Sequence, residues 1–318
     1  MNAIKKNTTF FLHFTHLHDK MKKEYKKEKR MRIYERAYAK VNLYLDVTAI
    51  GDDGFHALRS VMQTVGLYDG VSVDTSPAAE PSVSVSVRGR YRVPVGEGNL
   101  AYRAAMLYME AAAVPMRVHI HLEKHIPVAA GLGGGSADAA AVLRALNRAA
   151  GRRLSVPRLL ALAASLGSDV PFCLLGHTRL CEGRGERMQA LPPCPPLPLV
   201  ILPSPERVST PMAYAALDAA YNGFLSPCEH GDLSAMTDAL AASDVPRIYS
   251  SLYNIFEDVI LPTVPIAAEN RERLLSLGAR AALMSGSGPT VFGIFDTAEA
   301  AAQAALALGN TAVATATV

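Results

Sequence analysis

Apolar and polar residues alternate in three separate segments of this chain. Every second residue is Val or Leu between positions 41 and 47, valine alternates with serine at 83–87, and aliphatic residues alternate with histidine at 118–122. Side chains along a strand point to opposite faces in turn, so this alternation predicts β-strands with one buried face. A continuous apolar run at 199–202 predicts a further strand.

Apolar residues at helical spacing predict helices between and after these strands. The predicted helices cover about 58–67, 99–113, 136–150 and 156–166, and others begin near 212 and 246. Gly151 and Gly167 stand where C-caps belong, and Ser155 stands where an N-cap belongs. The chain therefore mixes helices with strands.

A proline-rich break divides the chain. Residues 191–198 read Leu-Pro-Pro-Cys-Pro-Pro-Leu-Pro. Proline lacks the backbone N–H that helices and sheets need. We therefore expect two domains, at 32–190 and 199–318, after a disordered basic extension at 1–31.

The composition is that of an ordinary globular chain. Of 318 residues, 50% are hydrophobic and 19% are charged. There is no run of about 18 apolar residues, so no membrane span is expected. The four cysteines form no CxxC pair, which favours reduced thiols in the cytoplasm over zinc or disulfides. His119 and His121 have no evident third ligand and are interpreted as solvent-facing strand residues.

The net charge of +3 conceals a basic N-terminus. Residues 1–32 hold ten Lys/Arg against three acidic residues, and the rest of the chain carries 22 basic against 26 acidic residues. A basic tail can bind nucleic acid or a membrane surface. Because the body is mildly acidic, we expect instead a solvated tail, a biological start at Met31, and neither nucleic acid nor membrane as a partner.

The segment 127–147 carries the clearest chemical signal. Four glycines between positions 131 and 135 lead into Ser136 and a helical segment. Glycine allows positive φ angles and a close approach of the backbone to a ligand. The N-terminus of the following helix presents free N–H groups and the positive end of its dipole. Together these features predict a phosphate-binding loop.

Three other phosphate loops do not fit this segment. A Walker A loop ends in Gly-Lys-Ser/Thr, and no lysine follows Lys124 before the end of the helix. A dinucleotide fingerprint needs an acidic residue about 20 positions later, where Arg152 and Arg153 stand. The glycine-rich loop of protein kinases lies in a hairpin, whereas a helix follows here. A second glycine cluster, Ser285–Phe295, predicts a turn before a strand and a nucleotide cleft closed from two sides.

Five motifs, in this order along the chain, resemble the GHMP kinases. They are the opening strand Tyr38–Val47, the segment Asp53–His56, the phosphate loop Pro127–Ala137, the catalytic-aspartate motif Leu166–Phe172 and the C-terminal glycine motif Ser285–Phe292. The resemblance runs from about residue 32 to the C-terminus. It implies an α+β fold of two domains, the first like domain 2 of ribosomal protein S5 and the second ferredoxin-like.

The resemblance also implies a reaction. ATP, with Mg²⁺, would donate its γ-phosphoryl group to a hydroxyl of a small-molecule substrate. Asp53-Gly-Phe-His56 is similar to the nucleobase-binding segment of family members that phosphorylate the 2-hydroxyl of a cytidine diphosphate-linked methylerythritol in isoprenoid precursor synthesis. A homoserine- or mevalonate-type kinase and a non-catalytic nucleotide-binding regulator are the alternatives. The expected location is the cytoplasm, and a homodimer is one option for the assembly.

Individual roles follow from the same resemblance. Asp169 is implied to be the general base, and Lys40 the cation that orients it and stabilises the transferred phosphate. Asn42 lies two residues after Lys40, hence on the same strand face, and is implied to bind substrate. Phe55 and His56 are implied to hold the cytosine ring. The family usually has tyrosine where Phe55 stands, so a hydroxyl is lost and the aromatic face remains.

Three further residues have less specific expectations. Tyr214 either forms the second side of the aromatic sandwich or packs in the core. Thr210 is a candidate substrate contact, and Ser136 either contacts phosphates or Mg²⁺ or caps the helix. No side chain is assigned as a metal ligand. The implied ATP loop consists of Pro127, Val128, Ala129, Ala130, Gly131, Leu132, Gly133, Gly134, Gly135, Ser136 and Ala137.

Overall fold

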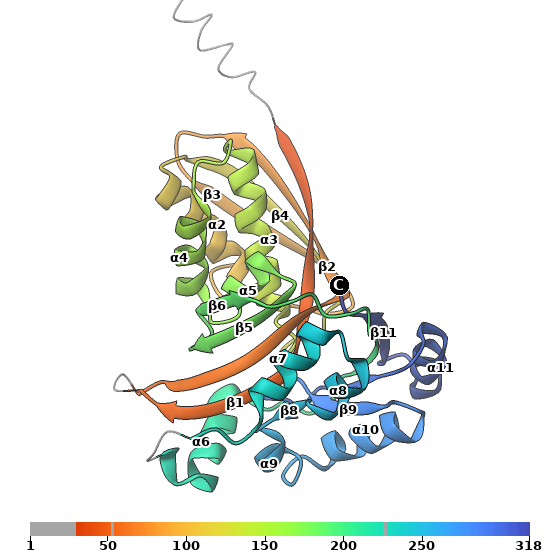
Figure 1. The fold of residues 1–318 in the computed structure, drawn as a ribbon. Coiled ribbons are helices and arrows are strands. Elements are labelled where there is room, and N and C mark those ends of the chain that lie inside the picture. Colours follow the sequence, from red (N-terminus) through yellow and green to blue (C-terminus); the bar gives the residue numbers. More distant parts are fainter. Residues whose placement is uncertain (1–29, 52–53, 225–227) are drawn as a thin grey trace, which may run out of the picture.

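The computed structural model describes residues 30–51, 54–224 and 228–318, which form two sheets with their helices (Figure 1). Residues 1–29 of the expected basic extension and Asp53 lie outside the described residues. The first sheet has seven strands along the path β3-β4-β2-β1-β8, with β5 paired to β2 and β6 paired to β5. These strands are β1 (Met31–Ile50), β2 (His56–Pro77), β3 (Ser82–Gly89), β4 (Met116–Lys124), β5 (Thr178–Gly183), β6 (Arg187–Ala190) and β8 (Tyr253–Asn254).

Strands β1 and β2 form one long antiparallel pair that runs through both halves of the molecule (Figure 1). The register between them shifts at three places, between Tyr38 and Lys40, between Asn42 and Tyr44, and between Val47 and Ala49. Such irregularities bend a strand and re-aim its side chains. Two of them flank Lys40 and Asn42.

The predicted helix at 58–67 is wrong, because this segment belongs to β2. Leu58, Val61, Met62 and Val65 have the spacing of a helix face. Residues 60–65, however, are all buried, since helices cover one face of the strand and the second sheet covers the other. A strand buried on both faces loses its alternation, so its residues can imitate a helical period.

Helices cover one face of the first sheet. They are α2 (Leu100–Ala112), α3 (Gly134–Ala149), α4 (Val156–Leu166) and α5 (Val170–Leu175), and they confirm the helices predicted at 99–113, 136–150 and 156–166. Aliphatic residues of β4 pack against these helices. His119 and His121 lie on the opposite face, where their Nδ1 atoms hydrogen-bond to Ser84 and Ser86 at 2.6 and 2.7 Å.

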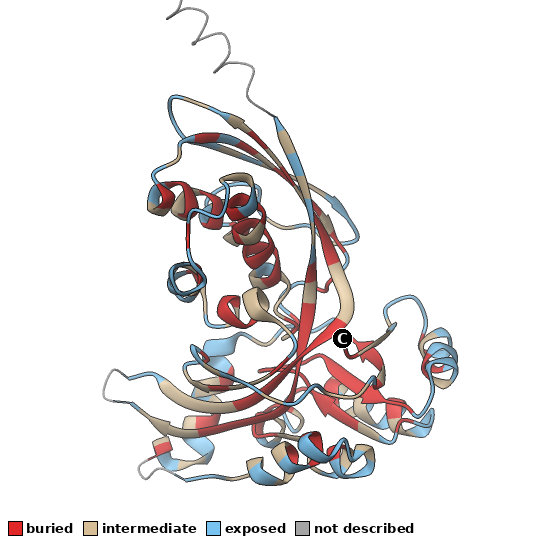
Figure 2. Cartoon of the chain, turned by 45° about the horizontal axis from the view of Figure 1, so that its top comes forward, coloured by how far each residue is buried: buried red, intermediate tan, exposed pale blue. Residues whose placement is uncertain are grey.

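The second sheet is antiparallel, with the order β11 (Val313–Ala316), β7 (Pro198–Leu202), β10 (Val291–Ile294), β9 (Ala281–Met284). Val200 and Leu202 pack with α10 (Pro265–Ser276) and α11 (Ala298–Leu308), whereas Leu199 and Ile201 pack against the centre of β1 and β2 and α7 (Leu233–Ala242). Burial on both faces explains the continuous apolar run at 199–202. Figure 2 shows this buried region continuing from the second sheet into β1 and β2.

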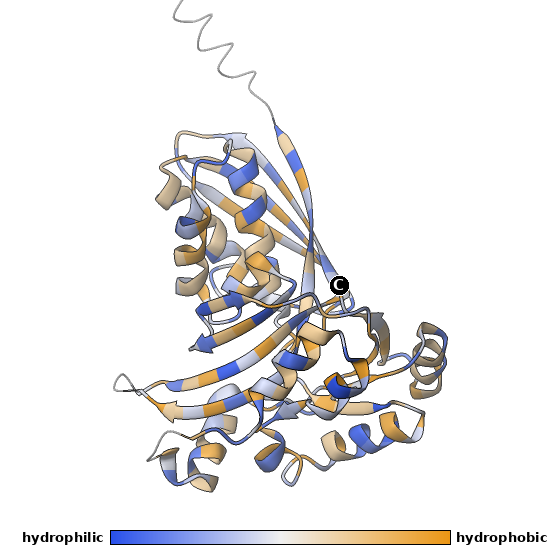
Figure 3. Cartoon of the chain, viewed as in Figure 1, coloured by the Kyte–Doolittle hydropathy of each residue, from blue (hydrophilic) through white to orange (hydrophobic). Residues whose placement is uncertain are grey.

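Shorter helices complete the second half of the chain. They are α6 (Thr210–Ala220), α8 (Val245–Ser250), α9 (Glu257–Ile260) and a 3₁₀ turn at Asn222–Phe224, and α6 and α8 confirm the helices predicted near 212 and 246. Helix α10 alternates hydrophilic with hydrophobic positions in Figure 3, as a helix with one buried face should. The predicted α+β class is confirmed.

Candidate active site

The glycine-rich loop ends where α3 begins. Gly133 is the N-cap residue with φ of 70°, and Gly131 has φ of 71°. Residues with a side chain rarely adopt these φ angles, so the loop favours glycine at both positions. Because α3 begins at Gly134, Ser136 stands in its first turn. The predicted role of Ser136 as a helix cap is therefore wrong, and Ser136 instead lines the cleft.

The C-terminal glycine motif packs directly on this loop. Ser285 Oγ donates to Gly131 O at 3.1 Å. Gly286 N–H donates to Asn42 Oδ1 at 3.0 Å, and Asn254 Nδ2 donates to Gly286 O at 2.9 Å. Two segments about 150 residues apart in the sequence thus form adjoining walls of one site.

Gly131→Ala is expected to lower the free energy of unfolding by about 2–3 kcal/mol. A Cβ at this position would lie 2.1 Å from Ser285 O, at a φ angle that strains alanine. Thermal unfolding without nucleotide measures the effect. Gly135→Ala is the matched control, because its nearest neighbour, Leu100 Cδ1, is 3.7 Å away and alanine favours the helix. Equal stability of the two variants would contradict the close packing of loop and motif.

Lys40, Asn42 and Asp169 meet beside the loop. Lys40 is 3% exposed, and its Nζ lies 2.8 Å from Asn42 Oδ1 and 3.7 Å from Asp169 Oδ2. Asn42 Nδ2 donates to Ser60 Oγ on β2 at 2.8 Å, which turns Oδ1 toward Lys40. Asp169 immediately precedes α5, and its side chain is about one-third exposed. A buried cation thus stands beside an accessible carboxylate.

His56 and Tyr214 form an aromatic pair in the same cleft. Their ring centroids are 4.4 Å apart with planes inclined by 36°. His56 Nε2 lies 2.7 Å from Asp218 Oδ1 on α6. Tyr214 also meets the ring of Phe256 edge-on at 5.0 Å. Tyr214 thus packs on the core, as one alternative predicted, and also lines the cleft, where its contact with a substrate ring stays a prediction.

Phe55 and Thr210 occupy more exposed positions around the cleft. Phe55 is 55% exposed, and the guanidinium carbon of Arg184 lies 4.4 Å from its ring centroid. Thr210 Oγ1 is 3.2 Å from Ser287 Oγ in the C-terminal glycine motif. Neither Arg184 nor Ser287 was indicated as a single residue by the sequence patterns.

One cleft of about 780 Å³ is lined by nearly all the predicted site residues. The lining includes Lys40, Asn42, Phe55, His56, Asp169, Thr210, Tyr214 and most of the ATP loop. Leu132 and Ala137 are the exceptions, because both are buried beneath the loop in the core. The structure thus brings the sequence candidates together.

A buried charge network lies under the phosphate loop, and the sequence patterns did not indicate it. Lys124 Nζ contacts Asp69 Oδ2 and lies 2.6 Å from Asp138 Oδ2 on α3. Asp69 Oδ1 also accepts the backbone N–H groups of His125 and Ile126 at 2.5 and 2.8 Å. One feature of the sequence could have indicated this network. In the alternating pattern of β4, Lys124 falls at a position where the side chain is expected to be buried.

The two carboxylates of this network differ in their surroundings. Asp138 Oδ1 is buried with no hydrogen-bond partner, whereas both oxygens of Asp69 are satisfied. Burial raises the pKa of Asp138 well above its usual range, although Lys124 opposes the shift. Burial lowers the pKa of Lys124, but the charges of Asp138 and Asp69 outweigh it and the pKa is raised overall. Lys124 is therefore a cation, and Asp138 is the member that takes up a proton most readily.

Within the described ranges, no group of three His, Cys, Asp or Glu side chains is arranged to hold a metal ion. Over the same residues, every helix is too short or too polar to cross a membrane.

Two family models match this chain. The model for the GHMP kinases N terminal domain matches residues 99–177, and the model for the GHMP kinases C terminal matches residues 228–314. A protein from Pelotomaculum thermopropionicum named 4-diphosphocytidyl-2-C-methyl-D-erythritol kinase is 45% identical over 269 residues, which are 85% of this chain and 91% of the relative. The chain belongs to the GHMP kinase family. The resemblance inferred from its motifs is confirmed.

Further similarities agree with this assignment. A Synechococcus sp. protein that is also named 4-diphosphocytidyl-2-C-methyl-D-erythritol kinase is 45% identical to this GHMP kinase. The match covers 84% of this chain and 86% of the relative. A crystal structure of 4-(cytidine 5'-diphospho)-2C-methyl-D-erythritol kinase matches with a TM-score of 0.75 and 38% identity, covering 90% of this chain and 99% of that one. A homoserine kinase from Cytophaga hutchinsonii, at 22% identity and a TM-score of 0.69, shares the fold.

Proposed function

We propose that this GHMP kinase transfers the γ-phosphoryl group of ATP to the 2-hydroxyl of 4-diphosphocytidyl-2-C-methyl-D-erythritol. The observation that carries the proposal is a single cleft that contains the phosphate loop, the Lys40–Asp169 pair and the His56–Tyr214 aromatic pair. Relatives that bear the name of this kinase, at 45% identity and over most of both chains, support it.

The donor phosphates belong at the loop and the N-terminus of α3. Positive φ angles at Gly131 and Gly133 shape the loop, and the free N–H groups of the first helical turn are suited to phosphate oxygens. Mg²⁺ binds largely through nucleotide phosphates and needs few protein ligands. The Ser136 hydroxyl is an oxygen group of the cleft that fits the ion and would hold it. When bound, the ion would neutralise part of the negative charge of the phosphates.

The acceptor chemistry belongs to Asp169 and Lys40. Phosphoryl transfer requires positioning, neutralisation of charge and a group to take the hydroxyl proton. Asp169 is the accessible carboxylate beside the loop and would accept that proton. Lys40 Nζ, 3.7 Å from Asp169 Oδ2, orients the carboxylate and stabilises charge on the transferred group. Asn42 holds Lys40 in place through its 2.8 Å contact and also ties the C-terminal motif to this pair.

The cytosine ring belongs beside His56, Tyr214 and Phe55. Asp218 engages His56 Nε2 and leaves Nδ1 for a hydrogen bond to the base edge. The exposed face of Phe55 offers a stacking surface, with Arg184 against the ring. Homoserine and mevalonate have no nucleobase for such a surface to bind.

A coupled ADP-release assay tests the proposal. The cytidine substrate, homoserine and mevalonate are compared at equal concentrations with saturating Mg²⁺ and ATP. Turnover of the cytidine substrate alone is expected. Turnover of homoserine or mevalonate instead would overturn the substrate assignment and leave the family assignment intact. If none of the three compounds stimulates ADP release, a different acceptor is favoured.

Phe55→Ala is expected to raise KM for the cytidine substrate about tenfold, because stacking of one base contributes about 1–3 kcal/mol. KM for ATP should change less than twofold, since Phe55 lies outside the phosphate loop. Steady-state kinetics with each substrate varied in turn measures both values. Tyr34→Ala, another exposed aromatic residue but outside the cleft, is the control. Equal increases in both KM values would contradict a nucleobase role for Phe55.

The remaining expectations complete the proposal. We infer a domain boundary within the proline-rich segment 191–198, with domains at 32–190 and 199–318. Each sheet with its own helices supports this division, although β8 joins the first sheet from the second half of the chain. We also propose cytoplasmic action on a small-molecule substrate, with a homodimer as the assembly to be tested by light scattering.

A further inference from the structure

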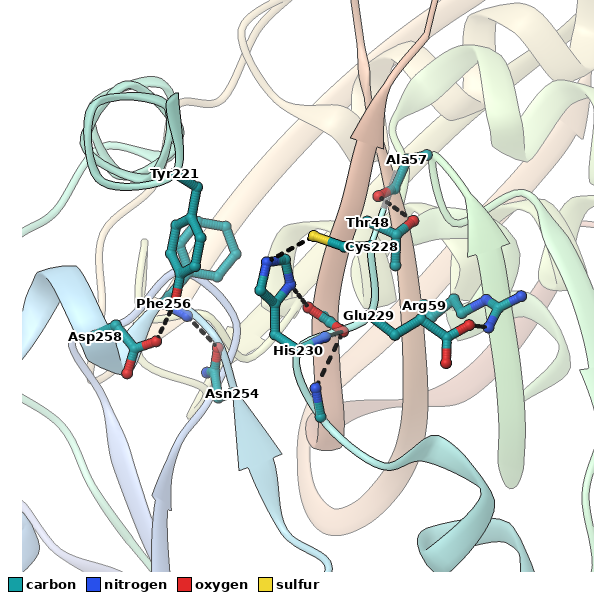
Figure 4. Close-up of polar contacts among 12 residues, drawn as sticks. Thr48, Ala57, Arg59, Tyr221, Cys228, Glu229, His230, Asn254, Phe256 and Asp258 are labelled. Carbon is teal, nitrogen blue, oxygen red and sulfur yellow. Dashed lines mark hydrogen bonds and ion pairs between the residues drawn. The ribbon is translucent and has the colours of Figure 1, made fainter. Parts of the chain in front are cut away.

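Cys228, His230 and Asp46 form a polar cluster outside the residues that line the cleft (Figure 4). Cys228 Sγ lies 3.1 Å from His230 Nε2, and His230 Nδ1 lies 3.0 Å from Asp46 Oδ1. Cys228 is exposed, whereas Asp46 is fully buried. Thiol, imidazole and carboxylate in this order are the arrangement that activates nucleophilic cysteines.

Asp46 sets which nitrogen of the His230 imidazole carries the proton. Its Oδ2 accepts the backbone N–H groups of His230 and Gly231 at 2.8 and 3.4 Å and the hydroxyl of Tyr44 at 3.4 Å. With Nδ1–H donated to Asp46, the neutral ring of His230 presents the Nε2 lone pair to the thiol. The thiol proton can therefore pass to Nε2, and the resulting imidazolium is stabilised by a buried carboxylate.

The segment that carries Cys228 is attached to both long strands. Cys228 N–H donates to Thr48 O on β1 at 3.0 Å, and Thr48 Oγ1 donates to Ala57 O on β2 at 3.3 Å. The neighbouring Glu229 forms an ion pair with Arg59 on β2. Figure 4 shows Cys228 and His230 facing one another from this attached segment. The contact between thiol and imidazole is thus held by the fold.

Three tyrosines and one aspartate around the cluster keep one charge state near neutral pH. Burial raises the pKa of Tyr44, Tyr221 and Tyr253, so these hydroxyls stay protonated. Tyr221 donates to Asp258, and Asp232 at the start of α7 is held ionised by hydrogen bonds that lower its pKa. The 3.1 Å contact between Cys228 Sγ and His230 Nε2 is thus the thiol–imidazole pair on which the chemistry of the cluster rests.

The remaining cysteines lack this environment. Burial raises the pKa of Cys173, and raises the pKa of Cys181 and Cys194 to about 12. Thiols held protonated in this way react slowly, because the thiolate is the nucleophile. The chain thus contains three internal reference thiols.

We propose that Cys228 is a modification site that reacts with low-molecular-weight disulfides by thiol–disulfide exchange. Its proton moves to His230 Nε2, and the thiolate attacks one sulfur of the disulfide. A new S–S bond joins that sulfur to Cys228, while the original S–S bond breaks and its electron pair leaves with the second sulfur as a thiolate. The imidazolium returns its proton to solvent or to the leaving thiolate. The disulfide is the only oxidant, and the product is a mixed disulfide on the protein.

Oxidised glutathione is the probe for the test. The full-length protein is incubated with it, and adducts at each cysteine are quantified against time by peptide mass spectrometry. At pH 7 the rate constant at Cys228 is expected to be about tenfold higher than in His230→Gln. Cys228→Ser should form no rapid adduct. His125→Gln, which removes an exposed histidine whose ionic partner is Glu123, should leave the rate unchanged.

A second measurement avoids dependence on the folding of a variant. A synthetic peptide with the sequence around Cys228 keeps the thiol and His230 but loses Asp46 and the attachment to β1. The folded protein is expected to react faster than this peptide and to lose less of its rate between pH 8 and pH 6. Equal rates and equal pH profiles for protein and peptide would overturn the proposal. Faster modification of Cys173, Cys181 or Cys194 than of Cys228 would overturn it as well.

Discussion

Asp169→Asn is expected to lower kcat by about 10²- to 10⁴-fold, the contribution typical of a general base. Asparagine keeps the shape of the side chain but cannot accept the proton of the substrate hydroxyl. The contact with Lys40 Nζ at 3.7 Å also loses its charge. KM for ATP should stay within about threefold, because in our proposal the phosphates bind at the loop and α3. Single-turnover kinetics with the cytidine substrate separates the chemical step from product release.

Asp238→Asn is the matched control for this change. Asp238 is an exposed carboxylate on α7 whose ionic partner is Arg247, and it does not line the cleft. Its replacement should leave kcat and both KM values unchanged. An Asp169→Asn enzyme that retains more than about one tenth of the wild-type kcat would remove Asp169 from the role of base.

Lys124→Met is expected to lower the free energy of unfolding by about 3–5 kcal/mol, the cost typical of removing one partner from a buried ionic network. Methionine has nearly the volume of lysine but leaves Asp69 and Asp138 buried together without a cation. Because these residues lie under the phosphate loop, the variant should also bind ATP more weakly. Denaturant unfolding at pH 8 measures the stability, with Arg117→Met on the exposed face of β4 as the control.

The loss of unfolding free energy caused by Lys124→Met should be smaller at lower pH. Burial already raises the pKa of Asp138 in the native protein, and removal of Lys124 raises it further. A carboxyl whose pKa is higher in the folded than in the unfolded state stabilises the protein when the pH is below its unfolded pKa. This contribution is lost as the pH rises through the folded pKa. The variant should therefore be closer to wild type at pH 5.5 than at pH 8. A deficit that does not depend on pH would contradict a buried carboxylate pair as its cause.

Local motifs could be predicted from the sequence because their chemistry depends on neighbouring residues. The phosphate loop requires glycines directly before a helix, and both features lie within ten residues. Lys40 and Asn42 were predicted on one strand face, and they contact each other at 2.8 Å. The roles of these residues came from family resemblance, and they stay predictions until the variants are measured.

Other features could not be predicted because they depend on contacts distant in the sequence. The helix expected at 58–67 failed because a second sheet covers the face of β2 that would otherwise be polar. Ser136 resembled a helix cap, but Gly133 takes that position because the loop turns there with positive φ. The pairing of Asp69 with Lys124 joins β2 to the end of β4, and no local pattern encodes it.

The sequence by itself determined the family, a candidate phosphate loop and a candidate catalytic pair, because each rests on residue types at short, characteristic spacing. Only the tertiary structure decided how these parts meet. It placed Ser285 and Gly286 against Gly131 and Asn42, and it buried Lys124 between two carboxylates beneath the loop. It also brought Cys228 and His230 to Asp46, more than 180 residues away in the sequence. The physical reason is that backbone contacts and buried charges depend on which segments pack together, and that packing is a property of the whole chain.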